Sequence, residues 1–312
     1  MRNQLTHHGA WQLRAKQVIL HNWRLYVLLL PALVWLVLFC YAPMYGISMA
    51  FVDFKANLGI MKSPWVGLKW FRTFFSTSQA VKTISNTVIL SVLGIVAGFP
   101  APIIFALLLN QITNSRYRKF IQTVTFAPHF ISTVVMVSMM TLMLSPTSGV
   151  INRFLAIFTG EQSLYMTRPE YFRTVYVVSG VWQGMGFGAI VYIAALAGIS
   201  PELHEAAIVD GATKLQRVLY IDIPGITPTM ILMFIMSMGN VLSVGYEKAF
   251  LMQNTMNTSV SEIISTYTYK IGLLNARYSF STAIGLFNSV INFIILMGTN
   301  FIMGKLTETS MF

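Results

Sequence analysis

The chain has 312 residues, of which 55% are hydrophobic and only 10% are charged, and its mean hydropathy is +0.65. One soluble core could not bury so much apolar surface, so the composition predicts an integral membrane protein and excludes an ordinary soluble domain. The formal net charge of +11 does not indicate nucleic-acid binding, because the basic residues lie between apolar runs instead of clustering on one polar surface.

The N-terminal segment, residues 1–24, carries Arg2, Arg14, Lys16 and Arg24 and contains no acid. The apolar run that follows it is much longer than the hydrophobic region of a signal peptide. We therefore expect this segment to remain uncleaved, as a cytoplasmic tail.

Long stretches without Asp, Glu, Lys or Arg follow along the chain. They cover residues 25–52, 83–115, 120–152, 174–201, 223–246 and 278–304. Each is longer than the roughly 20 residues that an α-helix needs to cross the hydrocarbon core. Unpaired backbone amides are costly in lipid, so these segments predict an all-α fold with six transmembrane helices.

The orientation of the helices is not decided by counting basic residues in all the loops. The N-terminal tail and the turn with Arg116, Arg118 and Lys119 are short, dense in positive charge and free of acids. Because such segments stay on the cytoplasmic side, we place both termini in the cytoplasm.

This orientation divides the chain into a transmembrane domain over residues 25–304 and a C-terminal tail over residues 305–312. Loops around residues 153–173 and 247–277 would be extracytoplasmic, together with the loop after the first span. The sizeable cytoplasmic connection is the segment 200–224, between spans four and five.

The segment 200–224 has the pattern of two short helices. Ser200 is expected to cap the first, Pro201 suits its first turn, and Gly211 can adopt the positive φ that ends it. A second short helix is predicted over residues 214–220, before Pro224 opens the fifth span. Two short helices at an angle would form a knob on the cytoplasmic side.

The same segment contains a spaced signature. It consists of Glu205-Ala206-Ala207, then Gly211 after three residues, Ile221 after nine more, and Ile223-Pro224 after one. This spacing resembles the EAA signature of binding-protein-dependent ABC importer permeases, with Ile223 where leucine is usual. The alternative is an ordinary amphipathic cytoplasmic loop.

The resemblance implies that this segment is the coupling helix, which inserts into a groove on a cytoplasmic ATPase subunit and carries its motion to the membrane helices. The residues implied in coupling are Glu205, Ala206, Ala207, Asp210, Gly211, Ile221 and Pro224.

Shorter phrases extend the resemblance along most of the chain. Residues 30–32, 41–46, 65–68, 99–103 and 192–196 look like the lipoprotein-linked polysaccharide or oligosaccharide permeases of the maltose-importer superfamily. The resemblance implies a type I ABC importer (MetI-like) fold with a core of five helices and a first span that wraps a partner. It also implies a carbohydrate substrate and a multi-pass location in a bacterial inner or plasma membrane.

The implied partners are a second homologous permease, two ATP-binding-cassette ATPase subunits, and an extracytoplasmic solute-binding protein. The loop 247–277 resembles the loop with which such permeases meet a docked binding protein, although a plain solvated connection is the alternative. ATP and magnesium would belong to the ATPase subunits, and we expect no cofactor in this chain.

Chemistry within the chain itself is not indicated. The Gly304-Lys305 pair is followed by Leu306 and lacks the upstream glycine of a phosphate-binding loop. Cys40 is the single cysteine, and the spans contain one histidine, His129, and no carboxylate. We expect His129 at a helix end or in packing. We therefore predict no catalytic residue and no metal site, and the absence of buried charge argues against an ion-driven carrier.

Uncharged polar residues in the spans are candidates for a substrate pathway: Trp182, Gln183, Asn240, Asn288 and Asn292. Amides can bond sugar hydroxyls and aromatic rings can stack on sugar faces, whereas the alternative role is hydrogen bonding between helices. Glycines at four-residue spacing are expected to allow close helix packing, either within the subunit or against a partner: Gly94, Gly98, Gly180, Gly184 and Gly188.

Two other functions compete with carbohydrate import. A permease of the same superfamily for amino acids or peptides would need carboxylate-binding groups in its spans, and the sequence places none there. A membrane scaffold that moves nothing would be insensitive to changes at Glu205 or Gly211.

Overall fold

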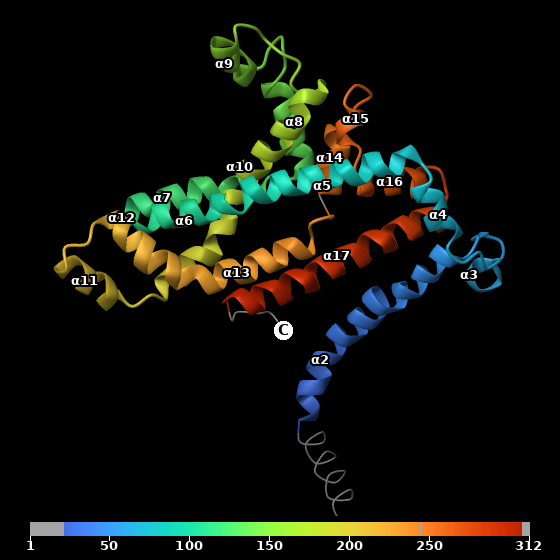
Figure 1. Cartoon of the computed structure of the whole chain (residues 1–312), viewed down its shortest axis with the longest axis horizontal. Coiled ribbons are helices and arrows are strands. Elements are labelled where there is room, and N and C mark those ends of the chain that lie inside the picture. The colour runs from blue at the N-terminus through green and yellow to red at the C-terminus, as the bar shows by residue number, and fades with distance from the viewer. Residues whose placement is uncertain (1–21, 244, 308–312) are drawn as a thin grey trace, which may run out of the picture.

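A computed structural model describes residues 22–243 and 245–307, which are built almost entirely of helices (Figure 1). The segments 1–21 and 308–312, which make up most of the two predicted tails, lie outside the described residues. Within the described residues, strand pairing is limited to one isolated bridge between Val52 and Trp65. The predicted all-α fold is therefore confirmed.

Five continuous helical stretches are long and apolar enough to cross a membrane. The first joins α2 (Trp23–Leu36), η1 (Val37–Tyr41) and η2 (Ala42–Phe51), and the second joins α5 (Ser78–Gly98) and α6 (Pro100–Asn110). The others are α10 (Pro169–Ala197), the run of α12 (Lys214–Arg217), η4 (Val218–Asp222) and α13 (Ile223–Gly239), and α17 (Tyr278–Thr307). Helix α17 extends three residues into the predicted C-terminal tail.

The third predicted span is broken instead of straight. Helix α7 (Ser115–Phe126) and η3 (Ala127–Phe130) meet α8 (Thr133–Met143) at an angle of 100°. Pro128 cannot continue a regular helix, and the Ser132 hydroxyl accepts a hydrogen bond from the N–H of Val135 at 3.4 Å, which starts α8 in a new direction. The count of six spans holds only when this bent pair is taken as one.

Two apolar segments extend away from the bundle in Figure 1. Helix α2 has no buried residue, and α9 (Val150–Thr159) exposes a large apolar face. Ile157 and Phe158 of α9 are each 75% exposed. Such surfaces are stable against lipid or against another apolar protein surface, but not against water.

Helix α10 lies at the centre of the bundle and packs against α5, α6, α7 and α13. One buried cluster joins Ala106 of α6, Tyr192 of α10 and Ile226 of α13. At Gly186 a Cβ atom would lie 2.1 Å from the carbonyl oxygen of Thr125. Only glycine therefore allows the backbones of α7 and α10 to approach this closely.

The loop predicted over residues 247–277 is folded. It contains α14 (Tyr246–Met252), α15 (Thr258–Ser261), α16 (Ile264–Tyr269) and η5 (Lys270–Leu274). The Glu262 carboxylate is buried and pairs with Lys82 of α5 at 3.5 Å and with Lys270 at 3.2 Å. The loop is thus part of the packed bundle, and a plain solvated connection is excluded.

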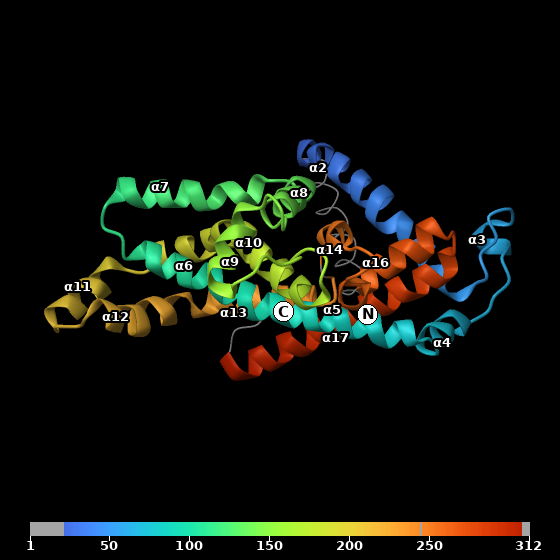
Figure 2. The ribbon, with the colours of Figure 1, turned by 90° about the horizontal axis from the view of Figure 1, so that it is seen from above.

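The two ends of the bundle differ. Helix α11 (Pro201–Val209) and α12 lie at one end, and α3 (Gly59–Lys62) and α4 (Lys69–Phe75) lie at the other, in both Figure 1 and Figure 2. The segment with the signature therefore projects from one tip of the molecule.

Candidate coupling site and glycine-walled cavity

The first half of the segment 200–224 forms the predicted short helix. Helix α11 begins at Pro201 and ends before Gly211, which has φ of +80°. An L side chain rarely adopts this conformation, which explains the glycine. Ser200 occupies the capping position, but its side chain makes no capping hydrogen bond, so that expectation is wrong.

The second predicted helix, over residues 214–220, is not a separate element. Helix α12 starts with a capping box between Thr213 and Gln216 and continues through the π turn η4 into α13. In this turn the N–H of Ile223 bonds to the carbonyl of Val218, and the chain passes Pro224 without breaking. The tip is therefore mechanically continuous with the fifth span.

The tip presents side chains that find no partner within the described chain. Glu205, Ala206, Asp210 and Gly211 are exposed, and no described side chain forms an ion pair with Glu205. Of the other signature residues, Ala207 and Ile221 are half-buried, whereas Pro224 is exposed. Large apolar side chains are also exposed around them: Leu203, Ile208, Val209, Leu215, Leu219 and Tyr220. The tip lies at an end of the bundle (Figure 1). Exposed apolar side chains at such a place are typical of a protein docking site.

Beneath this surface a buried carboxylate connects three elements. Asp222 is fully buried, and its carboxylate lies 3.3 Å from Nε2 of His204 on α11. It also accepts hydrogen bonds from the Asn110 amide of α6 at 3.5 Å and from the Gln111 amide at 3.2 Å. The coupling node formed by Asp222, His204, Asn110 and Gln111 therefore ties α11 to the ends of the second and fifth spans.

Neither Asp222 nor His204 is predicted as a functional residue from the sequence. Asp222 lies in the unspecified position between Ile221 and Ile223 of the signature. A usable signal existed, because Asp222 is the single acid between Gly211 and Glu247 and borders an apolar run. An acid at that place is expected to be paired or hydrogen-bonded.

A cavity of about 340 Å³ lies between α5, α6 and α10. Its walls include Gly94, Gly98, Pro102, Tyr176, Gly180, Gly184 and Gly188. A Cβ atom at Gly94, Gly98 or Gly184 would meet no atom within 4 Å, so the expected close packing is wrong for these three within this chain. Their missing side chains instead leave open space of the size of small-molecule sites.

Comparison with known proteins places this geometry in a family. Residues 98–303 match the family model described as "Binding-protein-dependent transport system inner membrane component". The chain is 39% identical over 288 residues to protein LplB of Bacillus subtilis (strain 168), covering 92% of this chain and 91% of that protein. The chain belongs to this family of transport permeases.

Solved structures agree with the family assignment. A bacterial ABC transporter involved in the import of the acidic polysaccharide alginate matches with a TM-score of 0.87 and 38% identity, covering 94% of the permease and 99% of that chain. A bacterial alginate ABC transporter in complex with an alginate pentasaccharide-bound periplasmic protein matches with a TM-score of 0.86 and 37% identity, covering 94% and 98%. These comparisons confirm the predicted type I importer fold. They also confirm the prediction that the chain is a transport subunit and not the ATP-hydrolysing one.

Two of the predicted pathway residues of the permease brace backbone segments. Asn292 is buried, accepts a hydrogen bond from the N–H of Leu242 at 2.9 Å and donates to the Ser243 hydroxyl at 2.9 Å. Gln183 donates to the carbonyl of Ile131 at 2.9 Å, directly at the break in the third span. These bonds are of the kind that holds helices together in membranes.

The other three candidates have different surroundings. Trp182 is 48% exposed, and Asn240 is exposed at the end of α13, where it donates to Met236 at 3.4 Å. The side-chain oxygen of Asn288 is buried without a hydrogen-bond partner. None of the five candidates lines the 340 Å³ cavity, so the structure does not bring them into one site. His129 stacks on the Phe187 ring with centroids 3.9 Å apart, which agrees with a packing role.

A buried cation beside the cavity was missed from the sequence. Lys248 of α14 is 9% exposed and donates to the carbonyl of Tyr176 at 2.6 Å. Its Nζ lies 4.5 Å from the centroid of the Tyr176 ring. Burial lowers the pKa of Lys248 to about 8, so the side chain is protonated in most molecules at neutral pH. In the sequence it follows Glu247 and looked like an ordinary loop residue.

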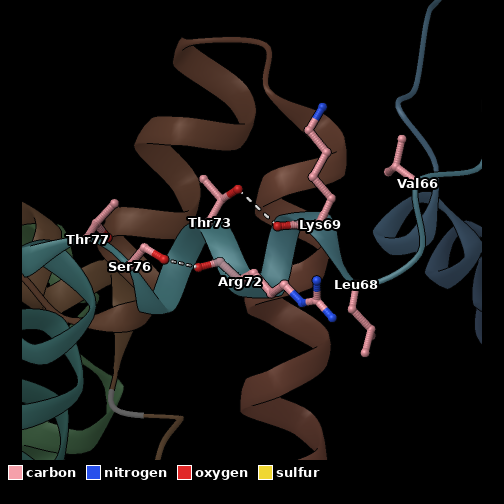
Figure 3. Close-up of a pocket in the computed structure, with 7 residues that line it drawn as sticks. All are labelled: Val66, Leu68, Lys69, Arg72, Thr73, Ser76 and Thr77. Carbon is pink, nitrogen blue, oxygen red and sulfur yellow. Dashed lines mark hydrogen bonds between the residues drawn. The ribbon is translucent and has the colours of Figure 1, made fainter.

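A second hollow, of about 720 Å³, opens at the end opposite the coupling node (Figure 3). Lys69 and Arg72 of α4 contribute cations, and Thr73 and Ser76 direct their hydroxyls to backbone carbonyls of the same helix. The hollow is open and has no enclosing wall, so it suits contact with another protein better than enclosure of a small molecule.

Proposed function

We propose that this permease is one transmembrane subunit of an ABC importer that takes up an oligosaccharide or a polysaccharide fragment. Its similarity to transporters of the polysaccharide alginate supports the substrate class. The spans contain uncharged amides and aromatic side chains, groups that can bond sugar hydroxyls and stack on sugar rings, although Gln183 and Asn292 bond backbone segments of this chain.

The single observation that carries the coupling role is the connection at the tip. Helix α11 is exposed on the side that a partner could contact, while His204 on its other side reaches the buried Asp222. A force on α11 would therefore reach α6 and α13 together through Asp222, Asn110 and Gln111. Signature residues from Glu205 to Pro224 would provide the contact surface and the bend.

In the proposed mechanism, ATP and magnesium bind to two partner ATPase subunits in the cytoplasm. Closure of the ATPase pair pushes α11, and the spans rearrange to open a path toward an extracytoplasmic solute-binding protein. ATP hydrolysis then returns the bundle to its inward-facing state, which releases the sugar. The signature end would face the cytoplasm of a bacterial inner or plasma membrane, with both termini on that side.

The remaining partner is a second homologous permease. The unpartnered apolar surfaces of α2 and α9 have the length and composition to pack on such a subunit as well as on lipid. The folded loop 247–277 and the open hollow around Lys69 and Arg72 lie away from the signature, where a binding protein would dock.

The test uses the complete importer, reconstituted in vesicles with its partner permease, ATPases and binding protein. An oligosaccharide presented by the binding protein should stimulate ATP hydrolysis and enter the vesicles, and amino acids should do neither. Gly211→Pro should abolish sugar uptake, because proline cannot adopt the φ of +80°. Full uptake in that variant would exclude the coupling role, and stimulation by amino acids alone would exclude the substrate class.

A further inference from the structure

Lys248 lies behind the wall of the glycine-walled cavity. A Cβ atom placed on Gly180 would lie 3.2 Å from Nζ of Lys248. Gly180 and Tyr176 both line the cavity, and Tyr176 also contacts the ammonium through its carbonyl and its ring. The ammonium thus lies beside two residues of the cavity wall, although Lys248 does not itself line the cavity.

The ammonium has no carboxylate partner within the described residues, where the three ion pairs all involve other groups. The titratable group that faces it from the packed elements is the phenol of Tyr176 on α10, which donates to the carbonyl of Gly245. Glu247 precedes Lys248 on α14 and forms no ion pair with it. A carbonyl and an aromatic face compensate only part of the cost of burying a charge.

The surroundings of Lys248 favour binding of a transported anion over a purely structural role for the ammonium. An ammonium has three donors, and the Tyr176 carbonyl uses one of them. Lys248 lies outside the spans but packs against the transmembrane helix α10, and a buried ionisable residue at such a place is by default a candidate functional group. The cavity of about 340 Å³ reaches the lower range of small-molecule sites, enough for one sugar ring.

We propose that Lys248 binds the carboxylate of an acidic saccharide, a chain that contains uronic acid residues, as it passes the glycine-walled cavity. This inference rests on the proposed function and names its substrate class. A neutral sugar in this cavity would leave the cation without an anion, whereas a uronate would supply one.

The test compares an acidic oligosaccharide with its carboxyl-reduced, neutral counterpart of the same length in the reconstituted importer. The measured quantity is the KM for saccharide-stimulated ATP hydrolysis. In Lys248→Gln the KM of the acidic saccharide should rise at least about tenfold, the effect of one charge-assisted hydrogen bond, and the KM of the neutral counterpart should not change. Lys248→Arg, which keeps the charge, should restore much of the preference.

A second pair of variants leaves Lys248 in place. Gly180→Ala should push the ammonium back from the cavity and lower the preference for the acidic saccharide. Gly184 lines the same cavity, but a methyl group there meets no atom within 4 Å. Gly184→Ala should therefore change the KM of both saccharides equally. Recovery of the assembled complex in detergent shows that each variant folds.

The outcomes separate the two proposals. Equal changes for the acidic and neutral saccharides in Lys248→Gln would assign Lys248 a structural role and overturn this inference. Unchanged kinetics in that variant would overturn it as well, while import of sugar would still stand. Failure of both saccharides to stimulate the unaltered importer would instead overturn the proposed function.

Discussion

Replacing Asp222 with asparagine tests whether the coupling node transmits force from α11. The substitution keeps the shape of the side chain but removes its charge and turns one acceptor into a donor. Asn110 donates to one carboxylate oxygen and Gln111 to the other, so the new donor would face one of these two amides, which also donates. We expect α11 to lose its fixed position against the second and fifth spans.

The size of the effect follows from the contacts. Three groups approach the carboxylate at 3.2 to 3.5 Å, near the long limit for hydrogen bonds, so each contributes about 1 kcal/mol. Relief from burying a charge offsets part of this sum, which leaves a net loss of about 2 kcal/mol. If the docked position of α11 is the one that binds the ATPase, its apparent affinity should fall by up to about 30-fold.

The assay is the binding of the purified ATPase subunit to the permease pair in nanodiscs, together with sugar transported per ATP hydrolysed. Glu202→Gln is the matched control, since Glu202 is an exposed acid in the first turn of the same helix, and it should change affinity less than about fivefold. His204→Gln should weaken binding as well, and the double variant should lose less than the sum. Normal affinity and normal coupling in Asp222→Asn would refute the node.

Three further predictions concern single positions. Gly211→Ala should lower the melting temperature by a few degrees, because alanine at φ of +80° costs about 1–2 kcal/mol although no atom lies near its methyl group, and an unchanged melting temperature would contradict this. Gly186→Ala should reduce the yield and melting temperature of the complex more than Gly94→Ala. The methyl group at residue 186 would meet the carbonyl oxygen of Thr125, whereas the one at residue 94 meets no atom within 4 Å. Equal effects of the two substitutions would contradict the packing of α7 on α10. The KM of the acidic saccharide should rise as pH increases through about 8, because Lys248 loses its proton there. The KM of a neutral saccharide should not change over the same range. A KM that is independent of pH for both saccharides would contradict a role for the charge of Lys248.

The membrane spans and the short helix α11 could be predicted from the sequence, because both depend on local chemistry. An apolar run longer than the hydrocarbon core can satisfy its backbone only as a helix, whatever surrounds it. Gly211 ends α11 because its own backbone adopts a positive φ, a property of that residue alone. The break at Pro128 and Ser132 was equally local and could have been predicted from the proline and the capping serine.

The coupling node and the cation were decided only by tertiary packing. Asp222 finds its hydrogen-bond donors in Asn110 and Gln111, which lie more than a hundred residues away along the chain. Lys248 becomes a buried cation because α14 folds back onto α10 beside a glycine, and the surrounding sequence looks like a solvated loop. Burial and long-range partners determine the free energy of a charge, and neither can be inferred from the residues next to it in the sequence.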